Sequence, residues 1–286
     1  MISNLDKWEA KYIQNLKDKE TIAWDDEEAY LRYPKWNFIY DKQILSNMAI
    51  NTPKTWDLTL ETPTTYPVYV KPRTNFYGLG KDSYVACSWD EIEDPLNSIA
   101  QQFLEGTHYS TDYVLKDGQI IDSWTFIGHK SFYNDFTLWE SYPFPDAIRG
   151  DVEDLLWGYT GIANFESIGG VIIEGHLRGS LQFYDISGGM LSKMPQFVNT
   201  GTYSPGKFKK TYSKVLRTKH SGKIEFSRVP YKPKGITSVQ LCYEPGVPLN
   251  VTDPGAFRHR YAVINGTNKK IIDSYAKNLR KFLIFK

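Results

Sequence analysis

Two glutamates, a histidine and an arginine lie close together near the middle of the sequence. Glu166 ends one predicted strand, while Glu174, His176 and Arg178 lie on or after the next strand, across the tight turn Gly169-Gly170. Residues two apart on a strand share one face, so Glu174 and His176 point the same way and Glu166 can oppose them. Converging carboxylates favour a hard cation such as Mg²⁺. An ion pair between Glu174 and Arg178 explains the same pattern equally well.

A lysine and two glycines form a second group with chemical potential. Lys71 ends the β-rich run over 66–71, and a loop containing Gly78 and Gly80 follows. A lysine at a strand end can hold a phosphate as a point charge, and glycines let backbone N–H groups approach phosphate oxygens. Alone, the pattern is more typical of a surface lysine.

An extended segment over 101–106, QQFLEG, stands before a β-rich run over 108–114. Such a segment between two lobes offers backbone N–H and C=O groups to the edge of an adenine base. Without the other groups it is only a loop before a strand.

Taken in order, these motifs resemble the ATP-grasp superfamily, of the carboxylate–amine ligase type, over about residues 40–180. The four matching motifs are Lys42 before Met48–Thr55, the PVYVKP run with its glycine loop over 67–80, the segment 101–115, and a last motif made of Gly161 to Glu166 followed by Glu174 to Arg178. Four motifs in this order and spacing carry the resemblance, since each is loose by itself.

The resemblance implies a set of roles around ATP and a divalent metal. Lys42 and Lys71 would contact the phosphates, and Gly78 and Gly80 would lie in a flap over them. Gln102 and Leu104 would contact the adenine, and His108 would reach the ribose. Mg²⁺ or Mn²⁺ would be held by Glu166, Glu174 and His176, while Arg178 and Lys71 would neutralise charge on the transferred phosphoryl group. The family pattern has Asn where His176 stands, and imidazole is better suited to transition metals than to Mg²⁺.

The local patterns predict the elements that position these residues. Helices are expected over 4–18, 41–50, 91–101, 147–157 and from Ile271 to Leu283, with strands at 66–71, 109–115, 119–127, 159–168 and 171–174. Asp117-Gly118 between two β-rich runs is a strong hairpin signal. The acidic stretch 18–28 is interpreted as a solvated face, and no helix is expected between residue 190 and the last helix.

The resemblance implies an α+β fold with two mixed α/β lobes that clasp a nucleotide. The expected divisions are a helical leader over 1–40, a first lobe over 41–100, a second lobe with the metal site over 101–190, and a C-terminal basic extension over 191–286. A separate Rossmann-like domain before the lobes is not expected.

Composition excludes several other classes of protein. The chain has 34 Lys and Arg against 33 Asp and Glu, so a globally basic nucleic-acid binder is not indicated. Cys87 and Cys242 form no disulfide framework, and no metal-binding CxxC spacing occurs. There is no apolar run of 18 residues and no secretory signal pattern, so we expect a cytoplasmic protein without a membrane partner.

The segment 206–235 is strongly basic, although positive and negative charges nearly cancel over the whole chain. Residues 206–235 hold ten Lys and Arg against the single acid Glu225, with aromatic residues between them. Such a patch can bind an anionic acceptor or a polyanion. A solvated edge hairpin, with lysines that prevent strand pairing, is the alternative.

The resemblance implies an enzyme that joins a carboxylate to an amine at the expense of ATP, with small-molecule or peptide substrates. The alternative function is a non-catalytic nucleotide- or nucleic-acid-binding protein that retains the fold. ADP release that depends on an added amine discriminates the two.

Overall fold

The computed structural model describes residues 13–76, 82–130, 136–143, 147–218, 222–241, 249–251 and 259–285. Gly78 and Gly80 therefore lie outside the described residues, as does most of the helix expected over 4–18. Cys242 also falls outside them.

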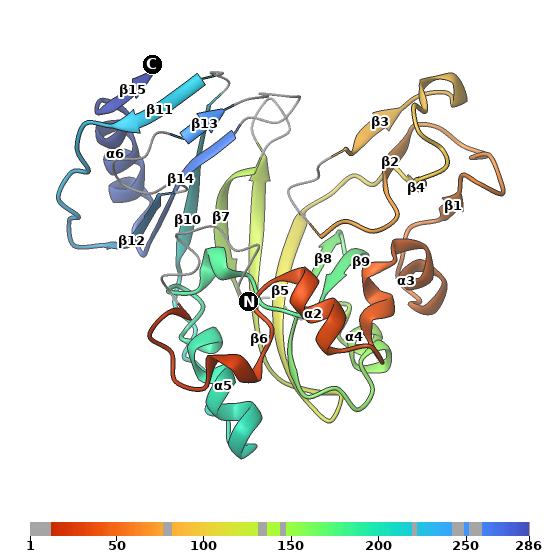
Figure 1. Ribbon diagram of the computed structural model, residues 1–286, viewed down its shortest axis with the longest axis horizontal. Helices are drawn as coiled ribbons and strands as arrows, with labels where there is room; N and C mark the ends of the chain where they lie inside the picture. The colour runs from red at the N-terminus through yellow and green to blue at the C-terminus, as the bar shows by residue number, and fades with distance from the viewer. Residues whose placement is uncertain are drawn as a thin grey trace. The chain divides into compact units, whose positions relative to one another are not determined.

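Runs of strands along the chain are separated by helices and short helical turns (Figure 1). The α-helices are α2 (Asp26–Arg32), α3 (Lys42–Met48), α4 (Arg149–Leu155), α5 (Met190–Thr200) and α6 (Lys269–Arg280). Short 3₁₀ turns are η1 (Lys19–Thr21), η2 (Asn37–Tyr40), η3 (Trp89–Glu91) and η4 (Leu181–Phe183). The strands are β1 (Thr55–Asp57), β2 (Val68–Pro72), β3 (Tyr84–Ala86), β4 (Ser98–Gln102), β5 (His108–Lys116), β6 (Gln119–Lys130), β7 (Phe136–Tyr142), β8 (Gly161–Ile168), β9 (Val171–His176), β10 (Tyr212–Thr218), β11 (Gly222–Phe226), β12 (Ile236–Leu241), β13 (Leu249–Val251), β14 (His259–Gly266) and β15 (Leu283–Phe285).

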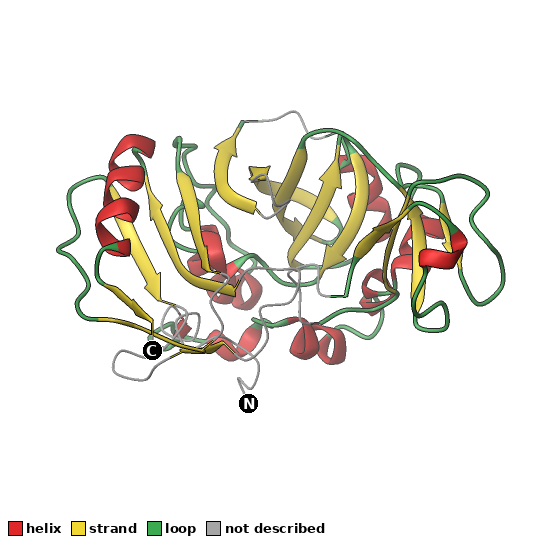
Figure 2. Ribbon diagram, turned by 90° about the horizontal axis from the view of Figure 1, so that it is seen from above, coloured by secondary structure: helices red, strands yellow, loops and turns green. Residues whose placement is uncertain are grey.

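The chain divides into two compact units that are each discontinuous in sequence. Unit 1 comprises Met1–Thr21, Trp124–Pro143 and Ser180–Lys286, and unit 2 comprises Ile22–Ser123 and Phe144–Gly179. Each unit contains both helices and strands, so the fold is α+β, as expected (Figure 2). The division falls inside β6. The domain boundaries expected at 40, 100 and 190 remain a prediction.

Unit 2 holds two antiparallel strand groups. The first is a four-stranded sheet in the order β1-β4-β2-β3, and the second runs β5-β8-β9. Burial follows the alternation expected of a sheet with one packed face, since Val68 and Val70 of β2 join Trp56 of β1 in one apolar cluster. A larger cluster joins the inner faces of β5, β8 and β9 to α4 and to the segment that ends at α3.

Unit 1 is built around the antiparallel order β12-β14-β10-β7, which continues to β6. The amphipathic helix α6 packs on β10 and β14 through Ile272, Tyr275, Ala276 and Leu279. Strands β11, β13 and β15 form a separate small sheet. No helix in the described part of the chain combines the length and the apolar character needed to cross a membrane.

Most of the expected elements occur where the patterns placed them, but three expectations were wrong. The helix expected over 91–101 is absent: η3 ends at Glu91 and the chain turns before β4 begins at Ser98. Pro95 explains this difference, because proline lacks the N–H and disfavours a helical conformation in the residue before it. The side chain of Asn97 donates to Asp94 across the resulting turn.

The other two errors concern helices that were missed. α5 contains Pro195 and is flanked by Gly189 and Gly201, and proline and glycine are typical of loops. The segment is nevertheless helical, and its Met194 and Phe197 are buried. The helix α2 begins inside the stretch 18–28, which had been interpreted only as a solvated face. Its N-cap Asp25 accepts a hydrogen bond from the backbone N–H of Glu28, a standard helix start.

The hairpin between β5 and β6 depends on Asp117 and Gly118, which both have positive φ. A Cβ on Gly118 would lie 2.7 Å from the backbone nitrogen of Gly158. Gly118→Ala should therefore destabilise the protein by about 1–3 kcal/mol, a cost that chemical denaturation measures. In Gly150→Ala, the matched control inside α4, an added Cβ meets no atom within 4 Å, so stability should stay equal or rise slightly. Equal effects of the two substitutions would contradict this reading of the turn.

Candidate functional site

The two glutamates singled out by sequence lie opposite each other on neighbouring strands. In the β8–β9 register Glu166 pairs with Glu174, and Asn164 pairs with His176. Directly opposed residues on an antiparallel pair place their side chains within contact range. Burial opposes ionisation of Glu174, yet the positive charges of Lys42 and Lys71 and the nearby His176 lower its pKa to about 2. Burial likewise opposes ionisation of Glu166, but a hydrogen bond with His108 lowers its pKa. Both carboxylates are thus ionised at neutral pH.

Two lysines reach this pair of carboxylates from other elements. The ammonium group of Lys42, at the start of α3, lies 3.2 Å from Oε1 of Glu174. Lys71, at the end of β2, donates to the backbone carbonyl of Ile173, the residue before Glu174, at 2.8 Å. Both lysines are buried. Glu174 therefore pairs with Lys42 in the structure, rather than with Arg178 as the alternative reading of the sequence had it.

The amino group of Lys71 has an unusual environment for a cation. Burial, together with the charge of Lys42, lowers its pKa to about 7, although Glu174 and Glu166 partly offset the effect. A lysine with such a pKa changes its charge near neutrality. A further negative charge beside the amino group would favour its charged form.

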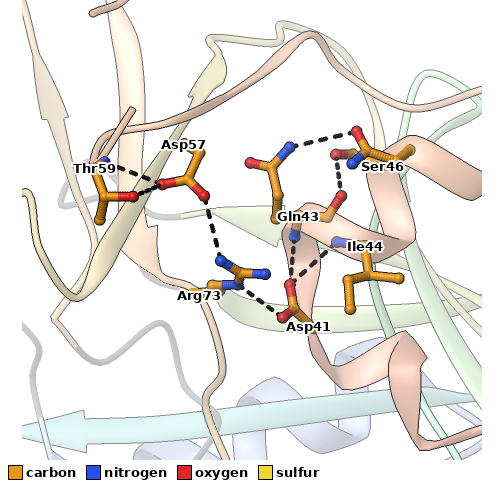
Figure 3. Close-up of polar contacts among 8 residues, drawn as sticks. Asp41, Gln43, Ile44, Ser46, Asp57, Thr59 and Arg73 are labelled. Carbon is orange, nitrogen blue, oxygen red and sulfur yellow. Dashed lines mark hydrogen bonds and ion pairs between the residues drawn. The ribbon is translucent and has the colours of Figure 1, made fainter. Parts of the chain in front are cut away.

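A charged network ties the start of α3 to the end of β2 and so sets the two lysines beside each other. Asp41 caps α3 by accepting from the backbone N–H groups of Gln43 and Ile44. Arg73, two residues after Lys71, donates to Asp41 at 2.7 Å and to Asp57 at 3.3 Å (Figure 3). The backbone N–H of Lys42 also donates to the carbonyl of Arg73. Asp41 and Arg73 thus hold Lys42 and Lys71 in position, although neither is a candidate ligand-binding residue.

The segment after α3 is fastened to β9. Asp151 of α4 accepts from the backbone N–H of Ile50 and from the side chain of Asn51, and the carbonyl of Asn51 accepts from the N–H of Ile172. Both α3 and η2 contact β9 as well. This anchoring keeps Lys42 within reach of Glu174.

The residues expected at the adenine and ribose lie between the end of β4 and the start of β5. Gln102 is the exposed last residue of β4, and Leu104 is half-buried just beyond it. The buried ring of His108 lies 2.9 Å from the Glu166 carboxylate through Nε2. Their contacts with a base and a ribose stay predictions.

The sequence analysis missed Asp26, which contacts both of the motif residues that follow Glu174. Its carboxylate is 5% exposed and contacts both His176 and Arg178. The hydroxyl of Tyr40 also donates to it. Asp26 is therefore a buried partner of two motif residues, and the interpretation of 18–28 as a wholly solvated face was wrong at this position. The cap at Asp25 was the sequence signal that could have revealed a helix here.

Glu166 and Glu174 could bind a hard cation whose remaining ligands are water and phosphate oxygens. Two facing, ionised carboxylates suit Mg²⁺, which is commonly held by one or two carboxylates together with substrate phosphates and water. Among the residues that the structure describes, no group of three or more His, Cys, Asp or Glu side chains is arranged to hold a metal ion. The assignment of Glu166, Glu174 and His176 as metal ligands stays a prediction.

The basic segment over 206–235 makes many contacts with the protein itself. Lys210 pairs with Glu140, Lys214 pairs with Asp273, and Arg217 donates to the carbonyl of Phe136. Lys207 and Lys209 are exposed. Part of the positive charge is therefore neutralised inside unit 1.

Comparison with solved structures identifies the fold. An L-amino acid ligase from Bacillus licheniformis superposes with a TM-score of 0.62 at 14% identity, over 91% of this chain and 74% of that one. The biotin carboxylase domain of Hydrogenobacter thermophilus 2-oxoglutarate carboxylase, in complex with MgADP and bicarbonate, gives 0.62 at 13% identity over 91% and 72%. Phosphoribosylglycinamide synthetase from Anaerococcus prevotii gives 0.53 at 12% identity over 99% and 88%.

The chain has an ATP-grasp fold. No family model and no curated protein matches the sequence. The ATP-grasp fold expected from the four loose motifs is thus confirmed by structural likeness at identities of 12–14%.

The buried lysine of this ATP-grasp chain predicts a pH-dependent stability. The unfolded state holds the Lys71 proton up to the ordinary lysine pKa, whereas the folded state releases it near pH 7. Unfolding free energy should therefore rise with pH between about 7 and 10, by up to about 1.4 kcal/mol per pH unit from this group. Lys71→Met should remove that contribution, and the exposed Lys54→Met should keep it. Parallel pH profiles of wild type and Lys71→Met would contradict the assigned pKa.

Proposed function

We propose that this protein is an ATP-dependent ligase that joins a carboxylate to an amine through an acyl-phosphate intermediate. The observation that carries the proposal is the meeting of two buried lysines, Lys42 and Lys71, with two opposed, ionised carboxylates, Glu166 and Glu174. Lysines suit the phosphates of ATP and the carboxylates suit its metal. The ATP-grasp fold supports the proposal, since solved proteins with this fold include an amino acid ligase and an enzyme bound to MgADP.

The reaction needs positioning and charge neutralisation rather than a side-chain nucleophile. An oxygen of the substrate carboxylate attacks the γ-phosphorus, the bond to the β,γ-bridging oxygen breaks, and ADP leaves. The amine then attacks the acyl carbon, loses a proton and expels phosphate, which leaves an amide bond. Mg²⁺ or Mn²⁺ would neutralise phosphate charge when bound.

The residues of this chain supply the remaining tasks. Lys42 and Lys71 would hold phosphate oxygens, and the proton on Lys71 would be retained once a phosphate lies beside it. Glu166 and Glu174 would hold the metal, and Arg178 would face the transferred phosphoryl group. Charges held in place by their neighbours can stabilise developing charge without first reorganising.

A binding protein that retained the fold is the second candidate. The histidine at 176, where the family pattern has Asn, favours it, whereas the presence of both lysines and both glutamates favours an enzyme. Release of ADP that requires both a carboxylate and an amine distinguishes a ligase. A screen of amines and carboxylates for phosphate release tests this directly and would identify the substrate pair.

The paired carboxylates predict metal-dependent nucleotide binding. ATP with Mg²⁺ or Mn²⁺ should raise the thermal unfolding midpoint of the wild type, because a ligand bound only to the folded state stabilises it. Glu166→Gln and Glu174→Gln keep side-chain volume and remove charge, so each should reduce the metal-dependent part of the shift and reduce turnover far more than stability. The exposed Glu61→Gln serves as the control. A folded wild type that shows no shift with either metal would overturn the site.

The basic segment 206–235 is proposed to help recognise an anionic acceptor rather than ATP. Its exposed cations predict the effect: Lys207→Gln combined with Lys209→Gln should weaken binding of polyglutamate and flatten its salt dependence, while ATP affinity stays unchanged. Lys269→Gln with Lys270→Gln removes the same charge from the exposed start of α6 and is the matched control. Equal loss in both double variants would show a net-charge effect without a specific patch.

A further inference from the structure

One buried carboxylate holds the residues that follow Glu174. Asp26 Oδ1 lies 3.0 Å from Nδ1 of His176, and Asp26 Oδ2 accepts from Nη2 of Arg178 at 2.7 Å. The Tyr40 hydroxyl donates to Oδ1 at 3.2 Å and accepts from the backbone N–H of Leu177 at 3.0 Å. Asp26 and Tyr40 therefore fix three consecutive residues, 176–178, at the end of β9.

The charges of this cluster define which atoms carry protons. The Asp26 carboxylate forms an ion pair with the guanidinium of Arg178. An ionised carboxylate can only accept, so Nδ1 of His176 must donate to it. A neutral His176 then presents the lone pair of Nε2. Histidines that bind metals commonly donate their other ring N–H to a carboxylate, which fixes the ring and its tautomer.

The position of Asp26 is itself well defined by its helix. Asp25 caps α2 through the N–H of Glu28 at 2.7 Å, and the Glu28 carboxylate accepts from the backbone N–H of Trp24 at 3.1 Å. Ala29, in the next turn, is fully buried in the main apolar cluster of unit 2. A carboxylate held this firmly can impose an orientation on its partners.

We propose that Asp26 is a positioning residue of the phosphate and metal site, which it serves by orienting His176 and Arg178 toward a bound metal nucleotide. The inference rests on the proposed function, because it assigns Asp26 to the same site. A buried ion pair that only stabilises the fold is the competing account, and removal of one partner from such a pair is costly in itself. The test must therefore read out binding as well as stability.

Titration calorimetry of the full chain with ADP, in the presence of Mg²⁺ or Mn²⁺, measures the effect. Asp26→Asn keeps the volume but turns an amide N–H₂ toward a donor, so metal–ADP affinity should fall by about 10–100-fold. Glu27→Gln, the exposed neighbour in the same helix, should bind as the wild type does. Wild-type affinity in a folded Asp26→Asn would overturn the inference.

A double-mutant cycle separates positioning from a general structural effect. If Asp26 acts through its two partners, Asp26→Asn should change ADP affinity less than about twofold in a background that already carries His176→Asn and Arg178→Gln. A full additional loss in that background would contradict the proposal. Stability of each variant, measured in parallel, shows the structural part of the effect.

A measurement on the wild type avoids any dependence on how the variants fold. Nitrogen-15 chemical shifts of the His176 ring, assigned by comparison with His176→Asn at a pH where the ring is neutral, report its tautomer. The Nδ1–H form supports the proposal, and the Nε2–H form overturns it. A wild type that binds no metal–ADP would overturn the proposed function as well, whereas normal wild-type binding with an unaffected Asp26→Asn overturns this inference alone.

Discussion

The site depends on a balance of charge between two buried lysines and two half-buried glutamates. Each of these groups would be costly to bury alone, since burial disfavours an isolated charge by several kcal/mol. Lys42 beside Glu174 offsets that cost, whereas Lys71, which donates to the backbone carbonyl of Ile173, retains a pKa lowered to about 7. Burial makes the charged form of Lys71 costly even beside the two glutamates. A phosphate bound there would favour that form. The capped helix and the Arg73 network keep the lysines in place.

The parts of this fold that the sequence could predict are those with local causes. Asp117-Gly118 specified a hairpin because its turn requires positive φ, and Gly169-Gly170 did the same for β8 and β9. A plain two-residue turn would set Glu166 opposite Ile173, and a β-bulge between Glu166 and Ser167 sets it opposite Glu174 instead. The ATP-grasp fold followed from the order of the motifs rather than from any one of them.

The parts that could not be predicted depend on contacts between distant residues. Asp26 lies in a run of acidic residues whose pattern indicates a solvated face. Its contact with His176, 150 residues later in the sequence, depends on how α2 packs in the folded protein. The pairing of Glu174 with Lys42 instead of Arg178 has the same origin. In α5, tertiary burial of Met194 and Phe197 outweighs the local effect of Pro195. Sequence patterns identify the residue types of the site, and tertiary packing decides which of them meet.

A crystal structure of the chain with Mg²⁺ and a non-hydrolysable ATP analogue tests the central claim most directly. The account predicts phosphate oxygens within hydrogen-bond distance of both Lys42 and Lys71, with the metal between the phosphates and the carboxylates of Glu166 and Glu174. Nucleotide bound elsewhere, or bound while the metal contacts neither glutamate, would contradict it.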